Sequence, residues 1–150
     1  MKAIMGKENG ANFFKCDLHI HTPVSECYEQ TGIGVEDIIN RSIEIGLKII
    51  AVTDHNADCS FPEIIEASEG KDLLVLPGVE ITTPQGGAAQ IHILAIFDKS
   101  DYRKVDELLI RIGILHEKRG RSETVAKKTI PELFCRSIAY SAFHQRSDEE

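Results

Sequence analysis

The sequence contains no long apolar run, and this absence limits where the protein can work. Its longest apolar stretches have the length of β-strands, so no membrane-spanning segment is predicted. Residues 1–15 contain no apolar stretch of signal-peptide length, which argues against export. The four cysteines include no CxxC pair, so we expect reduced thiols and a cytoplasmic location.

Positive charge is also in deficit. The 17 Lys and Arg residues are outnumbered by 24 Asp and Glu residues, which gives a formal net charge of -7 at pH 7. Binding to a phosphate backbone usually needs clustered positive charge, so the composition does not favour nucleic acid as a partner. It does not exclude nucleic acid either, because bound divalent cations would change the local field.

Short apolar runs alternate with amphipathic segments through the first half of the chain, a pattern typical of β/α organisation. We predict strands at residues 13–18, 48–53 and 73–76. A helix is predicted from Val35 to a stop at Gly46, because its apolar residues recur at helical spacing. The pattern therefore predicts alternating strands and helices.

The same alternation continues beyond these elements. A second helix is predicted at residues 60–70, where Ser60 begins a capping-box sequence. A further strand is predicted at residues 90–97, followed by a helix that Ser100 caps. The residues predicted to form the buried stripe of that helix are Val105, Leu108, Leu109 and Ile112.

Both ends of the chain are weakly patterned. Residues 1–12 are predicted to be a flexible N-terminus, and residues 117–150 to be a polar tail with one short strand at 138–143. With 150 residues and 42% hydrophobic content, the chain is long enough for one soluble α/β domain with a real core. It is too short for a complete eight-stranded β/α barrel, which needs about 250 residues.

The first predicted strand ends in the sequence DLHIHT, which contains two histidines at alternate positions. Alternation along a strand places His19 and His21 on the same face, where two imidazoles can share a metal ion. A pair of half-buried histidines at a strand end would give the same pattern. The motifs that follow favour the metal site.

Polar side chains also follow the second and third predicted strands. His55 lies within TDHN, and Glu80 lies between two apolar residues. Functional side chains in parallel sheets and barrels gather at the carboxyl ends of strands, so we expect His55 and Glu80 at the same edge. A buried carboxylate needs a cation, which is either a metal ion or an arginine. No arginine lies nearby in the sequence, so the preferred role of Glu80 is to bridge metal ions. Asp54 either orients an imidazole or caps the following turn.

His92 interrupts an otherwise apolar strand. A lone histidine in this position would usually be a hydrogen-bonded core residue. As the fourth histidine of a set that includes a buried glutamate, it is predicted to be a metal ligand. Imidazole and carboxylate ligands suit zinc, manganese or iron better than calcium. We expect two or three divalent ions at this site.

Four motifs, DLHIHT, TDHN, PGVEIT and IHILAIF, follow one another within residues 13–97. In this order they resemble the PHP (polymerase and histidinol phosphatase) family of metal-dependent phosphoesterases. The resemblance is strongest to family members in which an N-terminal PHP domain precedes an ATPase-like region. The resemblance implies a PHP-type distorted TIM-like barrel, which here would be incomplete at the C-terminal side. It further implies a ligand role for five residues: His19 and His21 on one ion, Glu80 as the bridge, and His55 and His92 on the neighbouring ions.

The resemblance draws attention to four further residues. Cys27 falls where some family members place another ligand, although a loop cysteine is often only a small hydrophobic residue. His144 is assigned to the later histidine that members carry at a strand end. Asp17 and Asp54 are the candidate catalytic residues, which would fix imidazole tautomers. No Asp-x-His motif follows, so the chain is truncated, another chain supplies ligands, or the site is incomplete.

The resemblance implies hydrolysis of a phosphate ester by water that a multinuclear metal centre activates. The expected substrate is a small phosphorylated compound or a nucleotide. Two alternatives remain: a catalytically impaired PHP module with a regulatory or docking role, and a nuclease that acts on short nucleic acids. An incomplete barrel would also leave sheet edges unpaired, which predicts a homodimer or a helix folded over the gap.

Overall fold

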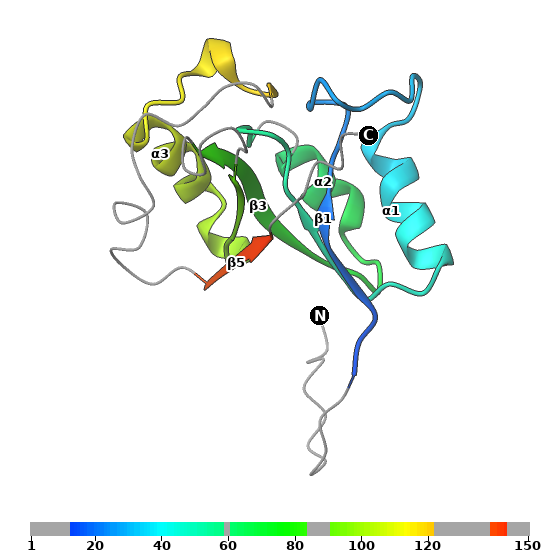
Figure 1. Ribbon diagram of the computed structural model, residues 1–150. Coiled ribbons are helices and arrows are strands. Elements are labelled where there is room, and N and C mark those ends of the chain that lie inside the picture. Colours follow the sequence, from blue (N-terminus) through cyan, green and yellow to red (C-terminus); the bar gives the residue numbers. More distant parts are fainter. Residues whose placement is uncertain (1–12, 59–60, 84–90, 122–138, 144–150) are drawn as a thin grey trace, which may run out of the picture.

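Strands, helices and short 3-10 turns alternate in the computed structural model, which describes residues 13–58, 61–83, 91–121 and 139–143 (Figure 1). The strands are β1 (Cys16–Ile20), β2 (Ile49–Val52), β3 (Leu74–Thr83), β4 (Ile91–Ile96) and β5 (Ala139–Phe143). The helices are α1 (Val35–Glu44), α2 (Phe61–Ser68) and α3 (Arg103–Arg111), and the 3-10 turns are η1 (Lys99–Asp101) and η2 (His116–Lys118).

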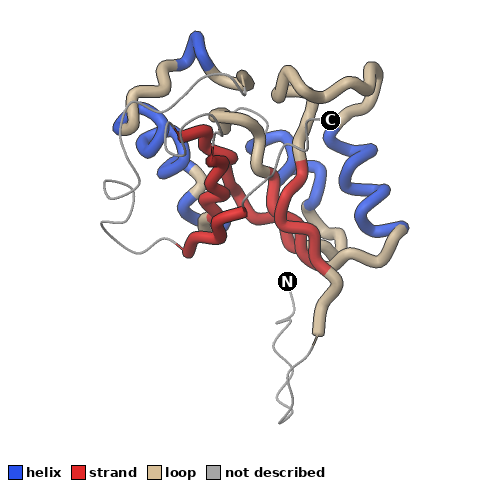
Figure 2. Tube along the Cα trace, in the orientation of Figure 1, coloured by secondary structure: helices blue, strands red, loops and turns tan. Residues whose placement is uncertain are grey.

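The strands form one sheet in the order β1-β2-β3-β4-β5, and their directions change half-way across it. β1, β2 and β3 run parallel to one another, as expected for strands that helices connect. β4 runs antiparallel to β3, and β5 runs antiparallel to β4. The result is a mixed α/β fold with a curled sheet (Figure 2).

β3 joins the two halves of the sheet because it changes its partner. Residues 74–77 pair with β2, whereas residues 78–83 pair with β4. Gly78 lies at the change, where an added Cβ atom would lie 2.8 Å from Thr53 Cγ2 and 3.0 Å from the carbonyl oxygen of Ala95. Glycine is therefore required where these strands come closest together. The same strand then carries Glu80 into the antiparallel half.

Two hydrophobic clusters hold the helices on the sheet. In the parallel half, α1 and α2 pack over the strands through buried apolar residues that include Ile39, Ile50, Phe61, Ile64 and Val75. In the antiparallel half, α3 packs on β3 and β4 through a second set that includes Val79, Ile81, Ile93, Leu108 and Leu109. Burial of each such side chain contributes about 1.5–3 kcal/mol, so these clusters fix the strands that carry the polar site.

The predicted order of strands and helices is confirmed, but three details are wrong. β1 begins at Cys16, where pairing with β2 begins, and Phe13 is 96% exposed outside it. Glu80 does not end the third strand, because β3 continues to Thr83 through its pairing with β4. Ser100 does not cap α3; its N–H donates to Asp98 Oδ1 at the start of η1.

The β/α alternation holds as far as β3, after which β4 and β5 depart from the repeat of a β/α barrel. The short strand predicted at 138–143 is present as β5. The predicted flexible N-terminus at 1–12, the cap at Ser60, the ligand His144 and most of the predicted tail at 117–150 lie outside the described residues. Within the described ranges, no helix is long and apolar enough to span a membrane.

Candidate metal centre

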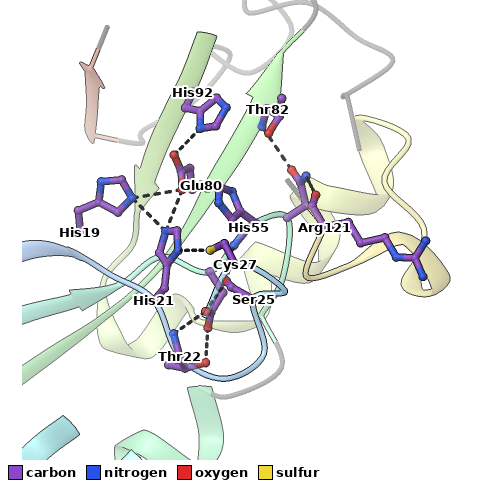
Figure 3. A network of polar contacts seen from close by, with 12 residues as sticks. His19, His21, Thr22, Ser25, Cys27, His55, Glu80, Thr82, His92 and Arg121 are labelled. Carbon is purple, nitrogen blue, oxygen red and sulfur yellow. Dashed lines mark hydrogen bonds and ion pairs between the residues drawn. The ribbon is translucent and has the colours of Figure 1, made fainter. Parts of the chain in front are cut away.

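Four histidines and one glutamate meet beside the point where the sheet changes direction (Figure 3). His19 lies in β1, and His21 follows that strand directly. His55 follows β2, Glu80 lies in β3, and His92 lies in β4. The side chains point toward one another although they come from segments far apart in the sequence. The structure thus brings together all five residues that the sequence analysis selected as the main ligands.

Strand pairing explains why these side chains converge. His55 forms an isolated parallel bridge with Glu80, so the residue after β2 lies beside the middle of β3. β4 is antiparallel, and His92 pairs with Thr82 near the carboxyl end of β3. His92 therefore enters the site from the amino end of its own strand. The position of His55 follows the rule that functional residues gather at the carboxyl ends of parallel strands, whereas the position of His92 follows from the antiparallel pairing of β4 with β3.

The Glu80 carboxylate lies at the centre of the cluster. Its Oε2 atom is 2.9 Å from His21 Nε2, 3.2 Å from His19 Nε2 and 3.2 Å from His55 Nδ1. Its Oε1 atom is 2.6 Å from His92 Nδ1. One carboxylate thus faces four imidazole nitrogens, with both of its oxygens in use.

Burial and charge act in opposite directions on these groups. Glu80 is only 2% exposed, and burial alone would raise its pKa. The hydrogen bonds with His19 and His21, the electrostatic effect of His55 and the hydrogen bond with His92 outweigh burial and hold the pKa of Glu80 well below its usual range. The contact with Glu80 raises the pKa of His19. Burial lowers the pKa of His55. The cluster therefore favours an ionised carboxylate and a neutral His55.

The arrangement of donor atoms fits a bound cation. Within the described residues, His55 Nδ1 is buried and lacks hydrogen-bond geometry with any partner, although Glu80 lies within ion-pair distance. His19 Nε2 and His21 Nε2 face each other at 3.0 Å. A neutral imidazole always has one nitrogen with a lone pair, so converging ring nitrogens form a natural ligand set. Nitrogen and oxygen donors of this kind suit divalent transition-metal ions.

Among the residues that the structure describes, the donor atoms divide into three overlapping groups, each with its ligand atoms within 4.8 Å of one another. The groups are His19–His21–Glu80, His55–Glu80–His92 and His21–Cys27–His55. His21, His55 and Glu80 each belong to two of these groups, so the groups share donor residues.

Cys27 lies beside the histidines, at the position that the sequence analysis proposed for a further ligand. Its Sγ atom is 3.1 Å from His21 Nδ1, the ring nitrogen that faces away from Glu80. Partial burial raises the pKa of the thiol. Two roles are compatible with this contact. Cys27 either ligates an ion together with His55, or accepts a hydrogen bond from His21 Nδ1–H and fixes the tautomer of that ring.

Comparison with known proteins identifies the family. The sequence profile of the PHP domain matches residues 17–141, which includes every residue of the cluster. The chain belongs to the PHP domain family. The resemblance drawn from the motifs is thereby confirmed.

The PHP chain is similar to proteins with several functions. The 5′-3′ exoribonuclease Rnm of Salmonella typhimurium is 29% identical over 119 residues, which cover 77% of this chain and 39% of the relative. The PolC-type DNA polymerase III of Caldanaerobacter subterraneus is 27% identical over 132 residues, which cover 78% of this chain and 9% of the polymerase. These alignments span well under half the length of either relative.

A solved structure supports the same assignment. A Bifidobacterium adolescentis protein described as a metal-dependent phosphoesterase superposes with a TM-score of 0.51 and 27% sequence identity. The superposition covers 66% of this chain and 33% of that protein. The curled α/β sheet of the PHP chain is therefore similar to part of that protein.

The two predicted catalytic aspartates contact backbone and hydroxyl groups in this PHP domain. Asp17 Oδ1 accepts a hydrogen bond from the N–H of His19 at 3.1 Å. Asp54 is 2% exposed and accepts hydrogen bonds from the Thr22 N–H, the Thr22 hydroxyl and the Ser25 hydroxyl, each at 2.7 Å. These contacts attach the loop after β1 to the end of β2. They place Asp54 in a network that neither of its two predicted roles described.

Sequence reasoning missed two buried residues of this PHP site. Ser25 accepts a hydrogen bond from the His55 N–H at 3.0 Å and so connects the loop after β1 to the loop after β2. Asn56 is fully buried with a positive φ of 49°, and its N–H donates to the Glu80 carbonyl oxygen at 2.9 Å. Asparagine tolerates a positive φ better than most residues. In the sequence, the position of Asn56 directly after His55 was the only signal that could have indicated that Asn56 contacts the strand of Glu80.

Proposed function

We propose that this PHP domain is a metal-dependent phosphoesterase whose ions are held by His19, His21, His55, Glu80 and His92. One observation carries the proposal: a buried carboxylate has the nitrogens of four histidines within 3.2 Å. Burial of the Glu80 carboxylate and the His55 imidazole is costly unless these groups bind a partner. The PHP assignment and the similarity to a metal-dependent phosphoesterase support a divalent ion as that partner.

The charge and the accessibility of these side chains suit the binding of divalent ions and a phosphate ester. When bound, divalent ions would supply positive charge that activates water and stabilises the phosphoryl oxygens. Glu80 remains ionised because its histidine neighbours lower its pKa, so both of its oxygens can serve as ligands. Burial keeps His55 neutral, with a lone pair for coordination. The His19 side chain is 41% exposed, which leaves this side of the centre open to a phosphate ester.

We infer two or three ions of zinc, manganese or iron, since the donor set combines imidazole and carboxylate. The two groups that contain Glu80 have nitrogen and oxygen donors alone, and the third contains sulfur. The curled sheet would correspond to part of the distorted barrel of PHP proteins. β1 is an edge strand of the described sheet. Folded proteins usually cover or pair such edges, so we still predict a homodimer or a covering helix at this edge.

The first candidate substrate is a small phosphate ester or a nucleotide, in keeping with the net charge of -7. The second candidate is a short nucleic acid, which the similarity to an exoribonuclease favours. The test is hydrolysis of p-nitrophenyl phosphate, its bis-ester, a mononucleotide and a short RNA in the presence of Mn²⁺. We expect the protein to hydrolyse the monoester or the nucleotide, and we expect a chelator to abolish this hydrolysis.

Each result of that test separates the candidates. Preferred cleavage of the RNA would support a nuclease. Metal binding without turnover of any of the four compounds would contradict phosphoesterase activity, and the regulatory or docking role would then replace it.

We further propose that Asp17 and Asp54 position the ligands and do not touch the substrate. Asp17 accepts from the backbone of His19, and Asp54 fixes Thr22, the residue after His21. Both carboxylates therefore act on the backbone that carries the imidazoles. Residues of this kind hold ligands in place and usually affect metal affinity when they are changed.

Cys27 is expected to ligate an ion, and its sulfur provides a spectroscopic test. When Co²⁺ replaces the native metal, the wild-type protein should show a near-ultraviolet charge-transfer band between sulfur and metal. The Cys27→Ser variant should lose this band but keep visible Co²⁺ absorption from the remaining ligands. Cys16→Ser is the matched control, because Cys16 is also a free, exposed thiol. Absence of the band in the wild-type protein would leave Cys27 only the role of hydrogen-bond acceptor for His21.

A further inference from the structure

A short segment after η2, residues 119–121, connects the loops that carry the metal ligands; we call it the clasp. The N–H of Gly120 donates to the carbonyl oxygen of His55 at 2.9 Å. The carbonyl oxygen of Gly120 accepts from the N–H of Glu26, also at 2.9 Å. Glu26 precedes Cys27 in the loop after β1. A single glycine thus joins the loop after β2 to the loop after β1.

No other residue type fits at the centre of the clasp. Gly120 has a φ of +79°, in the left-handed region that favours glycine. A Cβ atom at this position would lie 2.4 Å from the carbonyl oxygen of Val24. Any side chain would therefore push the loop after β1 away from His55. The close approach of this backbone sets the separation between the two loops.

The clasp also connects to the strand that carries Glu80. Asn56 Nδ2 donates to the carbonyl oxygen of Arg121 at 2.9 Å (Figure 3). The backbone N–H of the same asparagine donates to the carbonyl oxygen of Glu80 at 2.9 Å. Asn56 therefore links the clasp to β3 at the position of the central carboxylate.

Arg119 anchors the clasp to the body of the domain. Its side chain is only 6% exposed, and its guanidinium contacts Asp58 through Nη1 and Asp106 through Nη2. Asp58 belongs to the loop after β2, and Asp106 lies on α3. The planar fork of arginine can hold two carboxylates at once, whereas the single ammonium of lysine cannot reproduce this geometry.

We propose that the clasp is the positioning element of the metal centre. Gly120 sets the distance between His55 and the loop that carries Cys27, and Arg119 holds Gly120 in place. The clasp residues act through backbone contacts with the ligand loops, which is why no metal-binding motif reveals them. This inference rests on the proposed metal centre and adds to it a part of the chain that lies outside the ligand motifs.

Gly120→Ala tests the proposal against a closely matched control, Gly46→Ala. Gly46 has a φ of +80°, and an added Cβ there meets no atom within 4 Å, so both variants carry the same backbone strain but only one disturbs the ligand loops. Apoprotein is titrated with Co²⁺ while the visible absorption is followed. Gly120→Ala should bind Co²⁺ about 10- to 100-fold more weakly and with an altered spectrum, as outer partners of metal ligands do. Gly46→Ala should resemble the wild-type protein.

Arg119→Lys is the second variant, for use if Gly120→Ala fails to fold. It keeps the positive charge and should keep a native circular dichroism spectrum, but its Co²⁺ affinity should fall by about tenfold. Wild-type affinity and spectrum in Gly120→Ala, or in Arg119→Lys where Gly120→Ala does not fold, would overturn the clasp while leaving the metal centre intact. Absence of Co²⁺ binding in the wild-type protein would overturn the metal centre itself, and with it the clasp.

Discussion

The Glu80→Gln variant should lose bound metal and phosphoesterase turnover together. The amide keeps the size of the side chain but has one oxygen and no charge, so it cannot bridge ions. Outer partners of metal ligands already contribute about 10- to 100-fold in affinity, so loss of the central ligand should cost at least about 100-fold. The measurements are metal content after dialysis and the rate of p-nitrophenyl phosphate hydrolysis with added Mn²⁺.

Glu66→Gln is the control for this change. Glu66 lies on α2 with an exposed side chain, so its neutralisation should leave metal content and turnover as they are in the wild-type protein. If Glu80→Gln retained its metal and its rate, the four imidazoles around this carboxylate would serve some purpose other than a metal centre.

The Asp54→Ala variant should destabilise the metal-free protein by about 3–5 kcal/mol. The substitution removes the acceptor of three buried hydrogen bonds and leaves the Thr22 and Ser25 donors without it. Hydrogen bonds to a charged group contribute about 1.5–3 kcal/mol each, and their effects are not fully additive. The measurement is the free energy of unfolding in urea, in the presence of a chelator that removes metal.

Asp72→Ala is the control for Asp54→Ala. Asp72 pairs with Lys48, but its side chain is 77% exposed, so its loss should change the free energy of unfolding by less than about 1 kcal/mol. Unchanged stability of Asp54→Ala combined with a complete loss of turnover would contradict the positioning role. Asp54 would then have to act directly on the substrate.

Much of the proposed metal centre could be predicted from the sequence because the residues proposed as ligands follow local rules. His19 and His21 occupy alternate positions at the end of β1, and His55 follows the next strand, where parallel sheets place functional residues. Glu80 was identified because a carboxylate between apolar neighbours needs a partner. His92 was predicted from its chemistry, but the direction of its strand was not, because that direction depends on pairing between β3 and β4.

The remaining features depend on contacts between residues far apart in the chain. Pro77 and Gly78 resemble the end of a strand in sequence, yet in the structure they mark the place where β3 changes its partner. Asp54 contacts Thr22, which lies 32 positions earlier. Arg119 contacts Asp58 across 61 positions from within a weakly patterned segment. No periodicity or motif encodes these pairs, so only the folded chain reveals them.

The most direct test of the metal centre is the number of metal ions per chain. The purified protein would be supplied with Mn²⁺ or Zn²⁺, dialysed, and examined by elemental analysis beside the Glu80→Gln variant. We expect two or three ions per wild-type chain and a near-complete loss in the variant. A wild-type chain that retains no metal under these conditions would contradict the proposed metal centre.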